Sequence, residues 1–347
     1  MSLPASLSQS LPQSLPSSLR YSFPSIEAFR HLVKNLPYIF SDKVPDVLNF
    51  NGTVKLHGTH ADVIQENNEI IIQSRNRVLS IEKDNEGCAR FFEDRKQAIK
   101  TLFDKLSENI GTDHLLIAGE YCGRGIQSKV AICKLPRMFV VFAIKRLDTD
   151  QWVDILQYVD IINDKNNAIY NVCLAPTYQL AVTLETPETA IIQMDELTKQ
   201  VDTKCPFADI FGVNGPGEGI VWTCVENTTS DLWFKTKGAT HVTPIIPTIK
   251  NTDSLMEELI IPRMTQQRME QGISYLVDLG HDPKLIKNIN IFADWICNDI
   301  IKEELDILED SGIPMITIRK HIRLAACEWF KTTIKFTKKE LNFDLEK

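Results

Sequence analysis

The hydrophobic periodicity of the chain changes near Pro244, and this change limits the possible folds more than any other feature. After Asn51 the apolar residues gather in short β-rich runs, interrupted by two longer helical patterns. From Asp253 onward only helical spacing remains, over 255–279, 283–308 and 316–341. The sequence therefore predicts a mixed α+β domain from about 26 to 245 and a helical domain from about 250 to 347.

The expected strands of the first domain are short and separated by polar turns. They lie at Val54–His57, Ala61–Gln65, Ile70–Gln73, Leu115–Tyr121, Phe139–Leu147, Gly219–Val225 and Leu232–Lys235. Three helices are expected in the same domain. The first starts with a cap at Ser25–Arg30 and continues through Leu32 and Val33, and the others span Cys88–Ile110 and Thr186–Val201. A linker is expected around Pro244, Pro247 and Thr248.

Length and composition agree with two globular domains. The chain has 347 residues, of which 43% are hydrophobic and 24% charged. Its net charge of −8 argues against a protein that simply coats nucleic acid, although an enzyme needs only a local basic groove. No apolar run reaches the roughly 18 residues of a membrane span, and no membrane partner is expected.

The first 25 residues are rich in Ser, Leu, Pro and Gln, with Arg20 as their only charge. Frequent proline prevents a continuous helix, so 1–25 is expected to be a disordered tail, with an organelle transit peptide as the alternative. The eight cysteines are scattered without metal-site spacing, which favours reduced thiols. A cytoplasmic or nuclear location is expected, with a mitochondrial one as the alternative.

Five short segments place charged groups at the ends or edges of β-rich runs. They are Lys55–Thr59, Ser74–Arg77, Gly119–Tyr121, Glu218–Val221 and Lys235–Gly238. A single lysine on a strand is usually a solvated surface residue, so each segment alone is weak evidence. Together, the lysines and arginines can neutralise a polyphosphate, and the glutamates can hold a hard cation or a ribose. Neighbouring cations also lower the pKa of a lysine nucleophile. The residues alone therefore indicate a phosphate-handling enzyme.

The five segments resemble, in order and spacing, the motifs of the covalent nucleotidyltransferases, which include RNA ligases, DNA ligases and capping enzymes. DNA ligases and capping enzymes typically carry Lys-x-Asp-Gly, whereas His57 gives Lys-x-His-Gly here. This variant is similar to the RNA ligase 2 family of phage and to the kinetoplastid RNA-editing ligases, as are Gly119–Gln127 and the helical C-terminus. The resemblance implies an ATP-grasp-like nucleotidyltransferase domain of antiparallel sheets with flanking helices, followed by a small all-α domain.

The resemblance also implies roles for individual residues. Lys55 would attack the α-phosphate of ATP to form lysyl–AMP, with His57, Lys235 and Lys237 acting on the phosphates. Glu120 would hold the ribose, Arg75 would contact ribose or phosphate, and Phe142 would stack on adenine, with Phe139 as its competitor. Glu218 and Glu120 would bind Mg²⁺, or Mn²⁺ in its place. The implied cofactor contacts are Val54, Lys55, Arg75, Glu120, Phe142, Glu218, Lys235 and Lys237.

Two departures from the family concern substrate contacts. His60 stands where the family often has Asn, at the position that engages the substrate terminus, and Ala143 replaces an Asp after the stacking aromatic. The expected function is sealing of RNA 3′-hydroxyl and 5′-phosphate ends at nicks in duplex RNA, by a monomer. The alternatives are a DNA ligase or capping-type enzyme, and an inactive homologue that binds RNA or nucleotide.

The last expected helix carries a basic excess in an acidic protein. Its basic residues are Arg319, Lys320, Arg323, Lys331, Lys335, Lys338 and Lys339. A solvated helix face is the default interpretation. The alternative hypothesis is contact with the RNA backbone, since phosphate contacts give affinity without sequence specificity.

Overall fold

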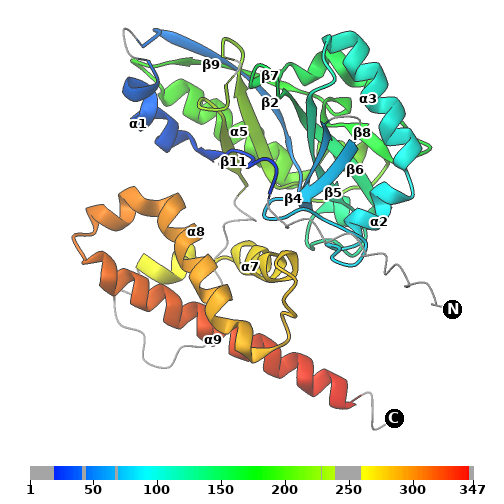
Figure 1. Cartoon of the computed structure of the whole chain (residues 1–347). Helices are drawn as coiled ribbons and strands as arrows, with labels where there is room; N and C mark the ends of the chain where they lie inside the picture. The colour runs from blue at the N-terminus through cyan, green and yellow to red at the C-terminus, as the bar shows by residue number, and fades with distance from the viewer. Residues whose placement is uncertain (1–18, 41–43, 67–68, 228, 239–258, 344–347) are drawn as a thin grey trace, which may run out of the picture.

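The computed structural model describes residues 19–40, 44–66, 69–227, 229–238 and 259–343. Two β-sheets form the larger part, and a group of C-terminal helices lies on one side of them (Figure 1). Most neighbouring strands pair antiparallel, so the expected α+β class is confirmed. No helix in these described ranges is long and apolar enough to cross a membrane.

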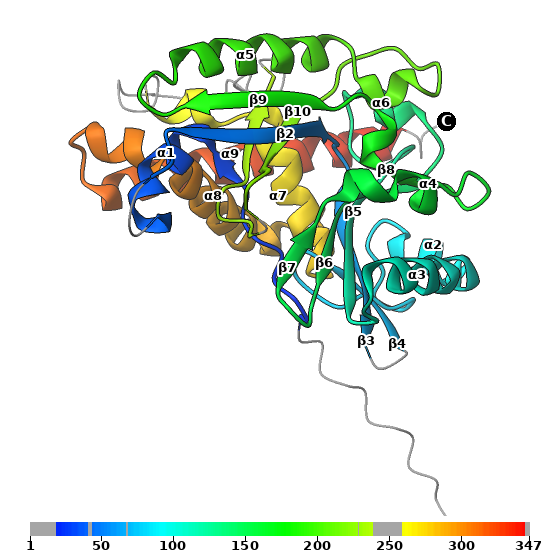
Figure 2. The same cartoon turned by 90° about the horizontal axis from the view of Figure 1, so that it is seen from above.

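The first sheet has five strands in the order β1-β11-β10-β2-β9, and only the β1–β11 pair is parallel. The strands are β1 (Glu27–Ala28), β2 (Val47–Lys55), β9 (Tyr178–Thr183), β10 (Gly219–Cys224) and β11 (Phe234–Lys237). Helices α1 (Phe29–Ile39) and α5 (Glu188–Thr203) pack on it, and α5 runs along β9 in Figure 2. Phe50, Trp222 and Phe234 fill the core between them. This core fixes the register of β2 and β10.

The second sheet has six strands, in the order β4-β3-β5-β6-β7 with β8 parallel to β6. The strands are β3 (Thr59–Glu66), β4 (Glu69–Ser74), β5 (Leu115–Cys122), β6 (Met138–Arg146), β7 (Gln151–Val153) and β8 (Ile169–Asn171). Helices α2 (Cys88–Glu93) and α3 (Lys96–Ile110) cover one face through a core that includes Phe92, Phe103 and Phe139. The short helices α4 (Val159–Ile162) and α6 (Pro206–Asp209) lie in the connections.

Several expectations for this part were wrong in detail. The single helix expected over 88–110 is two helices, because Arg95 leaves helical geometry at φ −118° and ψ 16°. No glycine or proline marks this break; the Arg95 side chain instead donates to the carbonyl of Asn167 over 2.7 Å and lies over the Phe91 ring.

The ends and the number of the strands also differ from the expectation. The helix expected to start at Ser25 begins at Phe29, because the two residues before it pair with β11 as β1. Strand β2 begins at Val47 and ends at Lys55, although Val54–His57 was expected. Strands β1, β7, β8 and β9 were not anticipated, and β11 begins two residues later than expected, at Phe234.

The tail expected over 1–25 is too long at its end. Residues 1–18 lie outside the described ranges, but the following segment packs against the second sheet. Phe23 is only 5% exposed, among aromatic side chains that include Trp152 and Trp233. Aromatic residues at the end of the Ser- and Pro-rich stretch provide apolar surface that the rest of the stretch lacks, so this end is ordered.

The C-terminal part is helical throughout its described residues. It consists of α7 (Gln266–Asp278), α8 (Ile289–Asp310) and α9 (Met315–Phe343), with short 3₁₀ turns at Ile261–Arg263 and Ile286–Asn288. Phe292, Ile296 and Phe330 lie in its own hydrophobic core. Helix α8 is kinked at Glu304, where φ is −125°. The expected linker and the start of the first expected helix, up to residue 258, lie outside the described residues.

Candidate active site

The centre of the site is an ion pair between Lys55 and Glu218. Lys55 is the last residue of β2, and its register partner in β10 is Gly219. Glu218 immediately precedes this glycine, and Nζ of Lys55 donates to its Oε2 over 2.7 Å. A Cβ on Gly219 would lie 2.0 Å from the carbonyl oxygen of Thr236 in β11. Only glycine therefore permits the strand approach that brings Glu218 to Lys55.

The Glu218 carboxylate is buried and surrounded by donors and cations. Nδ1 of His57 lies 3.6 Å from its Oε2, and Nζ of Lys237 lies 4.0 Å from its Oε1. The side-chain amide of Gln267, from α7, also donates to Oε1. Burial alone would raise the pKa of Glu218, but Lys55, His57 and Lys237 outweigh it and lower the pKa to about 2. Glu218 is therefore an anion throughout the physiological range.

The two lysines nearest Glu218 have opposite pKa shifts. Burial lowers the pKa of Lys55, but the charges of Glu218 and Glu120 outweigh burial and leave this pKa above its ordinary value. Burial and the neighbouring Lys235 lower the pKa of Lys237 to about 8. In this arrangement Lys55 is a protonated partner of Glu218. A ligand cation that drew Glu218 away would lower the pKa of Lys55 and expose its lone pair for attack.

Glu120 is a second carboxylate whose charge acts on Lys55. It lies in β5, and its Oε1 accepts a hydrogen bond from the backbone N–H of Gly58 over 2.7 Å. A Cβ on Gly58 would lie 2.4 Å from the backbone carbonyl oxygen of Tyr121, so this position requires glycine. Burial raises the pKa of Glu120, although Lys55 and His60 oppose the increase. The Lys-x-His-Gly segment therefore lies near two carboxylates, of which Glu218 pairs with Lys55 and Glu120 accepts from Gly58.

The C-terminal helices contribute charged groups to the same site. Glu303 of α8 accepts from Nζ of Lys235 over 2.5 Å and from Nη2 of Arg268 over 2.8 Å. Burial alone would raise the pKa of Glu303, but Lys237, Lys235 and Arg268 hold this pKa well below its ordinary value. Sequence reasoning missed Gln267, Arg268 and Glu303. In the sequence these three residues are polar positions on amphipathic helices, and nothing local distinguishes them from the solvent-exposed positions of the same helices.

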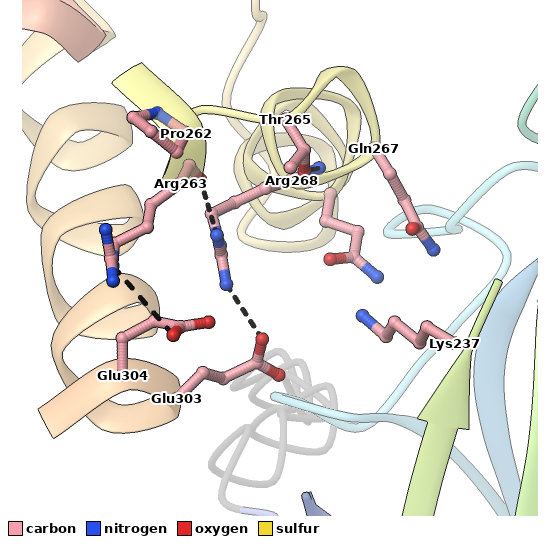
Figure 3. Close-up of a pocket in the computed structure, with 9 residues that line it drawn as sticks. Lys237, Pro262, Arg263, Thr265, Gln267, Arg268, Glu303 and Glu304 are labelled. Carbon is pink, nitrogen blue, oxygen red and sulfur yellow. Dashed lines mark hydrogen bonds and ion pairs between the residues drawn. The ribbon is translucent and has the colours of Figure 1, made fainter. Parts of the chain in front are cut away.

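A cavity of about 220 Å³ opens beside Lys237. Figure 3 shows Lys237 and Gln267 on one side of it, with Arg268 and Glu303 on the other. Pro262, Arg263, Thr265, Gln271 and Glu304 complete its lining. Its wall holds three cationic side chains and two carboxylates, so the cavity suits a highly polar ligand rather than an apolar one.

The remaining predicted residues occupy two other environments. Arg75 and Phe142 belong to a cluster around Phe23, whose ring lies 5.4 Å from the Arg75 guanidinium and 5.6 Å from the Phe142 ring. Phe139 is fully buried and packs on Phe92, which leaves Phe142 as the half-buried aromatic of β6. Val54 is 3% exposed in the first core, so its side chain contributes packing beside Lys55.

The described residues hold no ready-made cluster of three or more His, Cys, Asp or Glu side chains for a metal ion. Glu218 and Glu120 both border Lys55, and they offer the oxygen donors that Mg²⁺ prefers. Magnesium is commonly bound by one or two carboxylates together with substrate phosphates and water. These two residues therefore fit a cation that arrives with a nucleotide.

Lys55 is a partly buried lysine at the end of a strand, with two carboxylates near it and two further lysines on β11. This is the arrangement that the resemblance to the covalent nucleotidyltransferases led us to expect. The chain belongs to the RNA ligase family, whose family model matches residues 49–237. The matched range contains Lys55, Glu120, Glu218 and Lys235, and ends at Lys237. The C-terminal helices lie outside it.

Solved structures of a Naegleria gruberi RNA ligase are similar to this chain. A variant with ATP and Mn is 21% identical, with 64% of this chain and 57% of that chain covered and a TM-score of 0.44. The same ligase with PPi is 18% identical, with 67% and 63% covered and a TM-score of 0.43. The chain thus spans less than two thirds of these ligases. No curated protein matches it.

Proposed function

We propose that the protein is an ATP-dependent RNA ligase that works through a lysyl–AMP intermediate. The observation that carries the proposal is the position of Lys55, whose Nζ lies 2.7 Å from Glu218 in the segment matched to the RNA ligase family. His57 and Lys237 lie within 4.0 Å of the same carboxylate. This arrangement supports attack on a phosphate, because cations close to the nucleophile stabilise charge on the phosphoryl group.

The first reaction forms a P–N bond between Nζ of Lys55 and the α-phosphorus of ATP, and it breaks the bond to pyrophosphate. Lys55 must lose a proton before it attacks, which requires that its pairing with Glu218 be weakened. Lys235 and Lys237 neutralise the α-phosphate, and His57 assists at the phosphates. Glu120 accepts hydrogen bonds from the ribose, and Phe142 stacks on adenine. Pyrophosphate leaves on the side of the polar cavity beside Lys237.

Two further transfers complete the reaction. An oxygen of the RNA 5′-phosphate attacks the lysyl–AMP phosphorus, which releases Lys55 and leaves AMP joined to the RNA end through a pyrophosphate link. The RNA 3′-hydroxyl then attacks the 5′-phosphate phosphorus, loses its proton and expels AMP. Mg²⁺, or Mn²⁺ in its place, would be held by Glu218 and Glu120 and would supply charge neutralisation at the phosphates.

We further propose that nicked duplex RNA is the substrate, that the protein acts as a monomer, and that it divides into 26–245 and 250–347. A DNA-sealing or capping-type enzyme is the alternative, and His57 in place of an aspartate disfavours it. An inactive homologue is a second alternative. The retained set of Lys55, Glu120, Glu218, Lys235 and Lys237 disfavours that reading.

The experiment is a sealing assay with ATP and Mg²⁺ on duplexes carrying one nick with 3′-hydroxyl and 5′-phosphate ends. All-RNA, all-DNA and single-stranded RNA substrates are compared, with Lys55→Ala as the control variant. We expect Lys55-dependent sealing that is fastest on nicked RNA. Preferential sealing of DNA would contradict the substrate assignment. Failure to seal any substrate under varied pH and metal would contradict the ligase assignment.

A further inference from the structure

The segment that precedes α1 reaches into the nucleotide-binding region through Phe23. The Phe23 ring centroid lies 4.7 Å from that of His60 and 5.6 Å from that of Phe142, edge-on to the latter. The guanidinium of Arg75 lies 5.4 Å from the centre of the same ring. One side chain, outside the range matched to the family, therefore contacts His60 and the two proposed nucleotide contacts Phe142 and Arg75.

Hydrogen bonds hold this segment in place from the sheet side. The backbone N–H of Arg20 donates to Oε1 of Gln73 over 2.9 Å, and the amide nitrogen of Gln73 donates to Asp62 over 2.9 Å. Gln73 and Asp62 are both fully buried. The other Asp62 oxygen lies 2.8 Å from Nε2 of His60. A continuous network therefore joins the backbone of the segment to the residue on which Phe23 packs.

The guanidinium of Arg75 is also hydrogen-bonded to the backbone of this segment. Its Nη2 donates to the carbonyl oxygen of Pro24 over 3.1 Å, while Phe23 lies against its guanidinium. Arg75 is exposed and directly follows β4, so without these contacts its long side chain would sample many rotamers. Ordering such a side chain before a ligand arrives reduces the entropy lost on binding. Phe23 and Pro24 therefore prepare Arg75 for an anionic or hydroxyl-bearing ligand.

We propose that Phe23 is a positioning residue of the nucleotide site, which sets Arg75 and Phe142 in the orientation that receives the nucleoside part of ATP. This inference rests on the proposed function. The ring of Phe23 contacts His60, Phe142, Arg75 and two tryptophans, whereas the transfer is proposed for Lys55 and the groups paired with it. It acts on nucleotide binding rather than on the attack, so loss of its ring raises the ATP concentration for half-maximal rate and leaves the maximal rate nearly unchanged.

The test measures the rate of AMP transfer from labelled ATP to the protein as a function of ATP concentration. Phe23→Leu and Phe23→Met keep apolar volume but lose the ring face, and Phe23→Tyr keeps the ring. Phe103→Leu, in the core under α3, is the matched control for a lost buried aromatic. We expect the Leu and Met variants to raise the half-saturating ATP concentration about tenfold, with maximal rates within about twofold of the unaltered protein. The Tyr and Phe103 variants should bind ATP normally.

A double-variant comparison separates positioning from general loss of structure. If Phe23 acts largely through Arg75, Phe23→Leu should weaken ATP binding less in an Arg75→Ala background. An unchanged half-saturating concentration in both Leu and Met variants would overturn the inference, as would an equal change in Phe103→Leu or a loss confined to the maximal rate. Absence of the adduct in the unaltered protein would instead remove the proposed function itself.

Discussion

Lys237 is the residue of this site at which burial of a charge most clearly lowers the stability of the folded protein. Its pKa is lowered to about 8, first by burial and then by Lys235. A lysine with a lowered pKa destabilises the folded state at every pH below its ordinary pKa, and most strongly below the lowered one, because folding then disfavours a charge that the unfolded chain carries freely. A bound phosphate would supply the missing negative charge. The same burial that costs stability thus favours phosphate binding.

At the residue scale we therefore predict that Lys237→Met increases the free energy of unfolding at pH 7 by about 1 to 3 kcal/mol. The stability of the unaltered protein should rise as the pH increases from about 8 towards the ordinary lysine value, and this rise should be absent in the variant. Denaturant unfolding at pH 7 and pH 10 measures both effects. A variant that is less stable than the unaltered protein at pH 7 would contradict the shifted pKa.

At the scale of elements, the hairpin of β10 and β11 meets helices α7 and α8 across the catalytic face. The hairpin supplies Glu218, Lys235 and Lys237, and the helices contribute Gln267, Arg268 and Glu303. A second contact between the two parts is made by the Asp278 side chain at the end of α7, which accepts from Asn76 over 2.5 Å. Because Glu303 pairs with Lys235, its carboxylate occupies the position at Lys235 that the proposed reaction gives to a phosphate.

We accordingly predict that Glu303→Gln lowers the ATP concentration required for half-maximal AMP transfer, because Lys235 loses its internal anionic partner. Asp299→Asn is the matched control: Asp299 also pairs with Arg268, over 2.6 Å, but makes no ion pair with Lys235. The measurement is the ATP dependence of adduct formation in the two variants. If both variants change ATP dependence equally, the effect comes from Arg268 and not from competition at Lys235.

The sequence predicts the elements better than it predicts their contacts. The alternation of apolar residues predicted β3 to β6 and β10 to within two residues, but only the end of β2, because this signal is local. The order of the motifs predicted that Lys55, Glu120 and Glu218 belong to one site. The break at Arg95 and the burial of Phe23 depend on contacts across the fold, so no local pattern predicted them. The pairing of Lys235 with Glu303 also could not be predicted, because the two residues lie far apart along the chain. Glu303 lies on α8, outside the family motifs.

At the scale of the whole molecule, the proposed function requires an acidic chain to attract a polyanion. The basic residues of α9 are the candidate for that role. Arg323 pairs with Asp294, and Arg319 donates to Asn298 over 3.3 Å, so both are partly engaged by α8. Lys335, Lys338 and Lys339 have side chains outside the described set. The hypothesis of an RNA backbone contact therefore concerns the first half of α9.

We predict that replacing Arg319, Lys320 and Arg323 together with Ala weakens binding of nicked RNA and reduces the slope of log affinity against log salt by up to about 3. Thermal unfolding checks that α9 still packs through Phe330 and its apolar neighbours. The measurement is a binding titration at several salt concentrations. If affinity and slope are the same in the variant, this face of α9 makes no contact with the RNA backbone and is only solvated.

The proposed covalent role of Lys55 can be tested by incubating the protein with α-labelled ATP and Mg²⁺ and then mapping the labelled peptide. We expect a protein-bound label on the peptide containing Lys55. This bond should be acid-labile, as a phosphoramidate is. The label should be lost in Lys55→Ala and returned to ATP by added pyrophosphate. Absence of any adduct across varied pH and metal, or a label that persists in Lys55→Ala, would contradict the covalent role of Lys55.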